Sequence, residues 1–193
     1  MTSSRAGFSL LELLVVIAII AIMAAAGAMA LGGSGGKSLN GAAAVASSMF
    51  TQARTEAIMR GSGGVVRVIV DADNTSQRPD SYLRRMAVIY STNSGTSWDA
   101  AAKWVTLPAN ASFNTNKSTT SQSMTSSGLP GAFGAKTFFY YEFKPNGQMN
   151  TSAQFVVSPS VGGTNQLYGF KIHRMGKMTF FDTPNDIPTP STP

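Results

Sequence analysis

The 193-residue chain contains no cysteine, and this absence excludes several kinds of protein. It removes a disulfide framework, thiol catalysis, a cysteine-ligated zinc site and lipidation of a cysteine. The fold must therefore be held together by a packed core. At this length there is room for one membrane-inserting segment and one globular domain.

Charged residues are also scarce, at 12% of the chain, and His173 is the only histidine. The 15 basic residues outnumber the 9 acidic ones and give a net charge of +6, but they never form a run of five or six. This spread disfavours nucleic acid as a partner. His173 has no thiol or second imidazole to act with, and no G-x-S-x-G motif is present. The sequence therefore predicts no enzyme and no cofactor.

The apolar residues, 43% of the chain, are concentrated near its start. About nineteen residues from Leu13 to Leu31 carry no charge, which is enough for a membrane-spanning helix. A secretory signal is the alternative, because Arg5 is basic and residues 28–30 resemble a small-residue cleavage site. The apolar stretch is longer than the core of such a signal, however, and Glu12 lies at its start. The rest of the chain is rich in Ser, Thr, Asn and Gly, as expected of a tethered, secreted β-rich head.

A carboxylate at the edge of hydrocarbon needs a partner. Cleavage after Gly7 would create a positive α-amine on Phe8, four residues or about 6 Å along a helix from Glu12. The amine of one subunit could then neutralise Glu12 of the next.

The residues Gly7 to Glu12, followed by LLVVIAIIAIM, resemble the class III leader of type IV pilins and type II secretion pseudopilins. The resemblance implies that a membrane-embedded prepilin peptidase cuts after Gly7 and N-methylates Phe8. It also implies that Glu12 is the acidic residue that guides filament assembly. A plain membrane anchor or an uncleaved signal is the alternative.

After a GGSGG stretch at residues 32–36, where a flexible break is expected, apolar positions recur at helical spacing from Leu39 to Met59. The predicted buried stripe comprises Leu39, Ala43, Ala46, Phe50, Ala53 and Ala57. Arg60 and Gly61 are typical of the end of a helix. The strands predicted to follow cover residues 65–70, 84–90, 103–107, 136–143, 154–158, 168–173 and 177–181, with turns at 145–147 and 174–176.

Three further stretches of the chain point to one subfamily within this resemblance. Residues 52–61, 104–108 and 143–147 resemble the A-R-S-E-A-I-x-R-G, W-x-x-L-P and F-x-P-x-G stretches of the FimT/GspH-like minor pseudopilins. We interpret Arg54, Glu56 and Arg60 as a solvated helix face.

Other segments carry weaker signals. Asp71 and Asp73 offer oxygen ligands for calcium, but the glycine and distal glutamate of an EF-hand loop do not follow, so a turn is favoured. Residues 91–98 resemble the Asp box, a hairpin-turn device, with Asn93 in the Asp position. The Ser- and Thr-rich stretch 114–134 is expected to be a mobile loop, and the Pro-rich tail 184–193 to be extended and exposed.

The predicted architecture is α+β, with a long hydrophobic helix continuing into an amphipathic helix that packs on an antiparallel sheet. The predicted segments are a leader at 1–7, a membrane and filament-core helix at 8–31, the glycine break and amphipathic helix at 32–61, a head at 62–183 and the tail. The resemblance implies a minor pseudopilin in a type II secretion filament, with its head in the periplasm and its helix in the inner membrane. Its partners would be other pilins or pseudopilins. The alternative is a minor type IV pilin whose head binds DNA or a surface ligand.

Overall fold

The structure is a computed structural model that describes residues 34–73, 82–93, 95–120, 122–126, 129, 136–159, 166–181, 187–188 and 190. The chain divides into two compact units, Met1–Lys37 and Ser38–Pro193, and the second is the head. The hydrophobic segment predicted at 8–31 lies outside the described residues. Within the described part of the chain, no helix is both long and apolar enough to cross a membrane.

Helix α2 (Ser34–Arg60) forms the spine of the head. All six positions of the predicted stripe are buried, with at most 1% of each residue exposed. Four of the six are alanines, and small side chains let the helix backbone approach the strands closely. The helix ends as predicted, because Gly61 takes the left-handed conformation at φ 65°.

The predicted glycine break is wrong in part, because α2 already begins at Ser34 and includes Gly35 and Gly36. Each glycine weakens a helix by about 1 kcal/mol relative to alanine but keeps its backbone N–H. A helix stabilised by the packing of its later turns can therefore extend through two glycines.

The first sheet is antiparallel and has the strand order β3-β2-β1-β7-β6, with β4 also paired to β2. Its strands are β1 (Val65–Asp71), β2 (Arg85–Ser91), β3 (Asp99–Ala100), β4 (Val105–Thr106), β6 (Ser123–Ser126) and β7 (Lys136–Phe143). In the centre, Val68 lies opposite Val88 on β2 and Tyr141 on β7.

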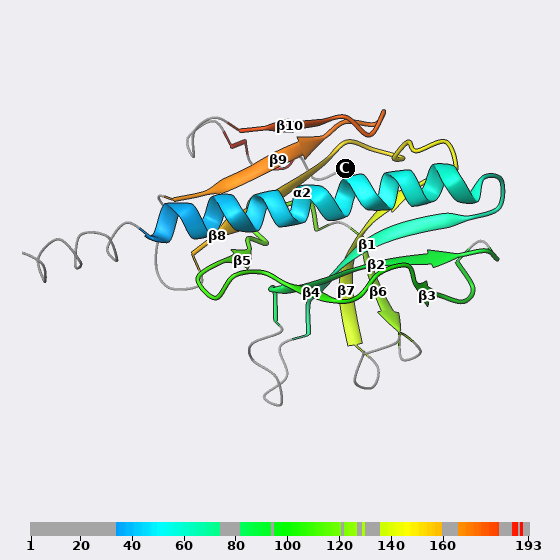
Figure 1. The fold of residues 1–193 in the computed structure, drawn as a ribbon, viewed down its shortest axis with the longest axis horizontal. Helices are drawn as coiled ribbons and strands as arrows, with labels where there is room; N and C mark the ends of the chain where they lie inside the picture. The colour runs from blue at the N-terminus through cyan, green and yellow to red at the C-terminus, as the bar shows by residue number, and fades with distance from the viewer. Residues whose placement is uncertain are drawn as a thin grey trace, which may run out of the picture. The chain divides into compact units, whose positions relative to one another are not determined.

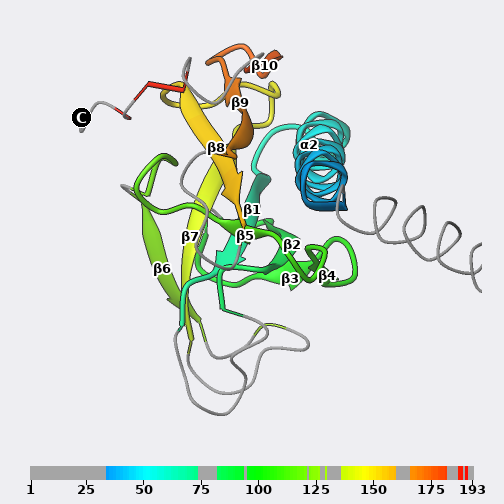
Figure 2. The ribbon, with the colours of Figure 1, turned by 90° about the vertical axis from the view of Figure 1, so that its left-hand side faces the viewer.

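The second sheet, also antiparallel, has the order β10-β9-β8-β5. It consists of β5 (Ser112–Phe113), β8 (Ala153–Ser158), β9 (Tyr168–Ile172) and β10 (Met178–Phe180). Figure 1 shows α2 crossing in front of both sheets, and Figure 2 shows the helix almost end-on with the strands on one side of it. The predicted α+β class, a helix on an antiparallel β head, is confirmed.

Phe50 joins the helix to both sheets. Its ring centroid lies 5.1 Å from that of Tyr141 and 6.3 Å from that of Phe143 on the first sheet. On the second sheet, Phe155 and Phe170 lie at 5.5 and 5.4 Å. All four pairs meet edge to face, which is a favoured arrangement for aromatic rings.

The segments expected to be loose are partly ordered. Strand β6 lies inside the predicted mobile loop 114–134, and Ser118 is buried there, bridging the backbone of Val156 through its hydroxyl. The tail was expected to be exposed, yet Ile187 is 3% exposed and packs in a cluster with Val156 and Leu167. Both expectations fail in part, because long-range contacts with β7 and β8, which local composition does not reveal, hold β6, Ser118 and Ile187.

Candidate functional site

Gly7, Phe8 and Glu12, the residues predicted for processing and assembly, lie outside the described residues. Their roles stay predictions. The structure instead describes the head, where function depends on which side chains are left available at its surface.

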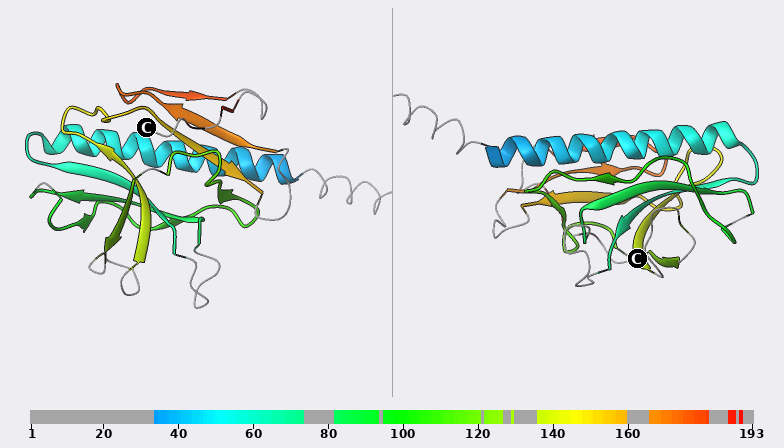
Figure 3. Two further views of the ribbon diagram at one scale, coloured as in Figure 1. Left: turned by 180° about the vertical axis from the view of Figure 1, so that it is seen from behind. Right: turned by 60° about the horizontal axis from the view of Figure 1, so that its bottom comes forward.

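Two glycine turns pack against the C-terminal half of α2. In the turn after β7, the N–H of Gly147 donates to the carbonyl of Lys144 at 2.8 Å, and φ of Gly147 is 73°. In the turn between β9 and β10, the N–H of Gly176 donates to the carbonyl of His173 at 2.7 Å, and φ of Gly176 is 76°. Both predicted turns are confirmed. They lie together because the N–H of Met149 donates to the carbonyl of Arg174 at 2.8 Å, and Figure 3 shows the helix running beside them.

Neither glycine leaves room for a side chain. A Cβ on Gly147 would lie 2.8 Å from Cδ1 of Ile58, and one on Gly176 would lie 2.6 Å from Nε of Arg54. Arg54 therefore lies against the two turns, with its Nε buried and without a hydrogen-bond partner among the described residues. This packing links two of the three stretches that carry the pseudopilin resemblance.

The interpretation of Arg54, Glu56 and Arg60 as a solvated face is wrong, because all three are half-buried and make defined contacts. Nε of Arg60 donates to Glu56 at 2.8 Å, and the Arg60 guanidinium lies 3.3 Å from the ring centroid of Tyr90. Since Tyr90 belongs to β2, this stack fixes the end of the helix to the first sheet.

Beside the turns, apolar side chains reach the surface. Ile58 is 50% exposed, Met59 76% and Met175 63%. Ile58 adjoins Gly147, and Nε2 of Gln148 lies 3.3 Å from Sδ of Met175, so the patch continues from the helix onto both turns. We call this the helix-end surface; it comprises Ile58, Met59 and Met175 with the exposed cations Lys144, Arg174 and Lys177.

Among the described residues, these cations have no acidic partner. The ion pairs among the described residues are Glu56–Arg60, Asp71–Lys136 and Glu142–Arg67, and none involves a cation of the helix-end surface. Lys171, which is also exposed and lies on β9, likewise makes no ion pair among the described residues. The helix-end surface therefore combines three exposed cations, without an ion pair among the described residues, with three exposed apolar side chains.

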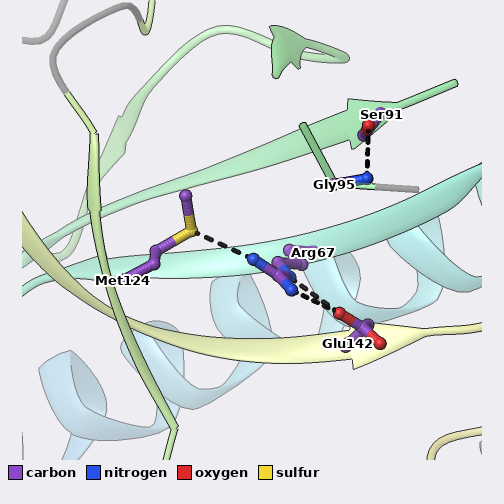
Figure 4. Close-up of polar contacts among 5 residues, drawn as sticks. All are labelled: Arg67, Ser91, Gly95, Met124 and Glu142. Carbon is purple, nitrogen blue, oxygen red and sulfur yellow. Dashed lines mark hydrogen bonds and ion pairs between the residues drawn. The ribbon is translucent and has the colours of Figure 1, made fainter. Parts of the chain in front are cut away.

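A second polar cluster lies on the face of the first sheet opposite α2 (Figure 4). Nε and Nη2 of Arg67 donate to Oε2 of Glu142 at 2.8 and 2.6 Å, and its Nη1 lies 3.6 Å from Sδ of Met124. The rings of Trp98 and Tyr140 lie 4.2 and 3.9 Å from the guanidinium. The donors and faces of the Arg67 guanidinium are thus occupied by other residues of the head, which indicates a structural role for Arg67.

Asp71 and Asp73, the calcium candidates, are both described. Asp71 is 1% exposed, and its Oδ2 accepts from Nζ of Lys136 at 3.1 Å, while its Oδ1 accepts from the N–H of Asp73. An ammonium group at the carboxylate opposes a second cation there. Among the described residues, no group of three or more His, Asp or Glu side chains could hold a metal.

The Asp-box-like stretch forms a closed turn between β2 and β3. Oδ1 of Asn93 accepts from Oγ of Ser91 and from the N–H of Ser97, at 2.7 and 2.9 Å. Oγ of Ser91 also accepts from the N–H of Gly95 at 2.8 Å, as Figure 4 shows. The amide oxygen replaces the carboxylate of an Asp, and the turn device predicted from the sequence is confirmed.

Sequence reasoning missed the helix-end surface. Ile58 and Met59 lay within the predicted helix but outside its buried stripe and were given no role, and Met175 was included only as part of a turn. The available signal was the stretch His173 to Lys177, which carries two cations and a methionine at a hairpin tip without an acidic residue.

Comparison with known families matches residues 2–28 to the prokaryotic N-terminal methylation motif. This confirms the prepilin-type signal predicted from the sequence, and the matched range contains Gly7, Phe8 and Glu12. No curated protein sequence matches the chain.

Two solved structures are similar in fold. One is the type IV minor pilin FimU of Pseudomonas aeruginosa, with a TM-score of 0.46 and 15% identity over 78% of this chain and 92% of that chain. The other is the minor pseudopilin EpsH from the type 2 secretion system of Vibrio cholerae, with a TM-score of 0.46 and 13% identity over 75% and 95%. These likenesses are too distant to carry a function to this chain.

Proposed function

We propose that the chain is a minor pseudopilin of the GspH/FimT-like type, a structural subunit of a type II secretion filament. The observation that carries the proposal is the methylation motif at residues 2–28, which precedes a helix packed on an antiparallel head. In this proposal prepilin peptidase removes residues 1–7 and methylates Phe8. Residues 8–31 cross the inner membrane and then enter the filament core, and the head lies in the periplasm.

The proposed mechanism is mechanical rather than catalytic. Glu12 of one subunit pairs with the Phe8 amine of its neighbour, which sets the register of the helices as they leave the membrane. Removing one partner of a buried charge pair costs about 3 to 5 kcal/mol, so this pair would select the correct register strongly.

The test is deletion of the gene in its natural host. Loss of this subunit is expected to leave secreted proteins in the periplasm, while surface pili and DNA uptake continue as before. Normal secretion combined with lost pili or lost DNA uptake would contradict the assignment to type II secretion.

The second candidate is a minor type IV pilin whose head binds DNA, and four exposed cations that make no ion pair among the described residues favour it. Lys144, Lys171, Arg174 and Lys177 are all exposed. Binding that depends on phosphate contacts weakens steeply with salt. Titration of the purified chain with duplex DNA at two salt concentrations tests this candidate, and the absence of salt-dependent binding would contradict it.

A further inference from the structure

We infer that the helix-end surface docks an acidic protein surface with an apolar centre, presented by another subunit of the same filament. This inference rests on the proposed function, because the filament supplies the neighbouring subunit. It goes further in naming the residues and the chemistry of the contact.

Exposed apolar side chains lie on neighbouring elements, at the end of α2 and on the turn between β9 and β10. Among the described residues, four large apolar side chains are at least half exposed, and Ile58, Met59 and Met175 are three of them. Single exposed apolar residues need no explanation, but a group over adjoining elements marks an interaction site. Methionine suits such a site because its unbranched side chain adapts to a partner.

The elements that present these residues are held firmly. Gly147 and Gly176 leave no space between the turns and the side chains of Ile58 and Arg54. The Arg60 stack on Tyr90 then fixes the end of the helix. A partner would therefore meet a preorganised surface, which lowers the entropy lost on binding.

The cations define the charge expected of the partner surface, which should be negative. Lys144, Arg174 and Lys177 lie at the two turns that border the end of α2 and make no ion pair among the described residues, so an acidic rim on the partner would be complementary. The described residues of a second copy of this chain do not offer such a rim. Asp99 is the only exposed acidic residue in the described part of the chain, and it lies on β3.

The exposed apolar side chains also favour a protein partner over DNA. A phosphate backbone would contact the cations but would bring no apolar group to Met59 and Met175. Protein interfaces instead combine an apolar, methionine-containing core with a polar rim, and the helix-end surface carries both kinds of residue.

Photocrosslinking of the full chain in its host tests the inference. The photoreactive residue benzoylphenylalanine replaces Met59, and the matched control carries it at the exposed Asn110. The Met59 probe is expected to crosslink to an acidic filament subunit, identified by mass spectrometry. Adding K144E and R174E should reduce that product at least about tenfold, because the charges would then repel the partner. Adding K103E, an equal change at an exposed lysine outside the surface, should leave it unchanged.

The outcomes distinguish a failure of this inference from a failure of the proposed function. A processed chain with a charge-dependent protein crosslink at Met59 but not at Asn110 supports the inference. A nuclease-sensitive product, the absence of a product, or a product unaffected by K144E and R174E would overturn it and leave the proposed function standing. A chain that is not cut after Gly7 would overturn the proposed function and this inference with it.

Discussion

At the scale of single residues, aromatic side chains hold the head together. Phe50 contacts rings on both sheets, and each such pair contributes about 0.5 to 1.5 kcal/mol beyond the burial of its area. Tyr141 is the largest of the fully buried side chains. Its hydroxyl donates to the carbonyl of Gln154 at 3.3 Å, so a polar group is satisfied inside the aromatic core.

Burial raises the pKa of the Tyr141 hydroxyl well above its usual range, and this makes stability depend on alkaline pH. In the unfolded chain this tyrosine loses its proton near pH 10, whereas the folded chain keeps it neutral. Its contribution to the free energy of unfolding is therefore complete below about pH 10 and is lost above it, at up to about 1.4 kcal/mol per pH unit.

Urea unfolding of the full chain between pH 8 and about pH 11 measures this effect. In Y141F the free energy of unfolding should fall less steeply with pH above pH 10, because the ionisation of one tyrosine no longer contributes to the fall. At neutral pH the change should cost about 1 kcal/mol or less, because the Gln154 carbonyl keeps the N–H of Thr119 as a donor. Equal alkaline slopes in the two proteins would show that Tyr141 does not resist ionisation.

At the scale of elements, the closeness of β8 and β9 depends on Gly169. A Cβ at this position would lie 2.3 Å from the carbonyl oxygen of Phe155 and 2.9 Å from Cα of Val156. The glycine is needed for this close approach of two backbones rather than for an unusual backbone angle.

G169A is expected to lower the free energy of unfolding by about 1 to 3 kcal/mol or more, because β8 and β9 must move apart. G41A is the matched control, since a Cβ at Gly41 of α2 meets nothing within 4 Å. It should raise stability by about 0.5 to 1 kcal/mol through helix propensity. Chemical denaturation measures both, and equal effects at the two positions would contradict this packing.

The C-terminal segment is held against β8 by hydrogen bonds and by the packing of one side chain. The side-chain amide of Gln154 donates to the carbonyls of Lys117 and Pro188, at 2.6 and 2.9 Å, so it joins the loop after β5 to the tail. Nζ of Lys117 also donates to the carbonyl of Ile187 at 3.3 Å. The side chain of Ile187 seals the contact by packing against Val156 and Leu167.

I187A should therefore lower the free energy of unfolding by about 2 kcal/mol or more. P188A keeps the carbonyl that Gln154 uses and should stay within about 1 kcal/mol of the original chain. Thermal unfolding compares the two, and limited proteolysis should cut the tail faster in I187A. A tail equally resistant in both variants would show that Ile187 does not hold it.

At the scale of the whole molecule, the sequence was most informative where a single periodicity decides the structure. The α2 stripe was predictable because its apolar spacing matches one helix face. Turns at Gly147 and Gly176 were predictable from local chemistry. The contact of Ile187 with β8 and the formation of β6 were not predictable, because their stability comes from residues distant in the sequence. The exposure of Met59 and Met175 depends on where the turns lie against the helix, which periodicity does not encode.

Filament assembly by the proposed mechanism requires the carboxylate of Glu12. E12A is expected to be cut and methylated normally but to be missing from the filament fraction, because the neighbouring amine loses its partner. S9A, which changes a nearby uncharged polar residue, should assemble as before. Quantitative immunoblotting of purified filaments measures both. Incorporation of E12A at the original level would show that the proposed pair does not drive assembly.

The central claim is that this chain is a processed, prepilin-type filament subunit, and the mature N-terminus tests it most directly. Mass spectrometry of the N-terminal peptide of the protein isolated from its host would reveal both cleavage and methylation. This peptide is expected to begin with N-methylated Phe8. A chain that keeps residues 1–7, or that begins at any other residue, would contradict it.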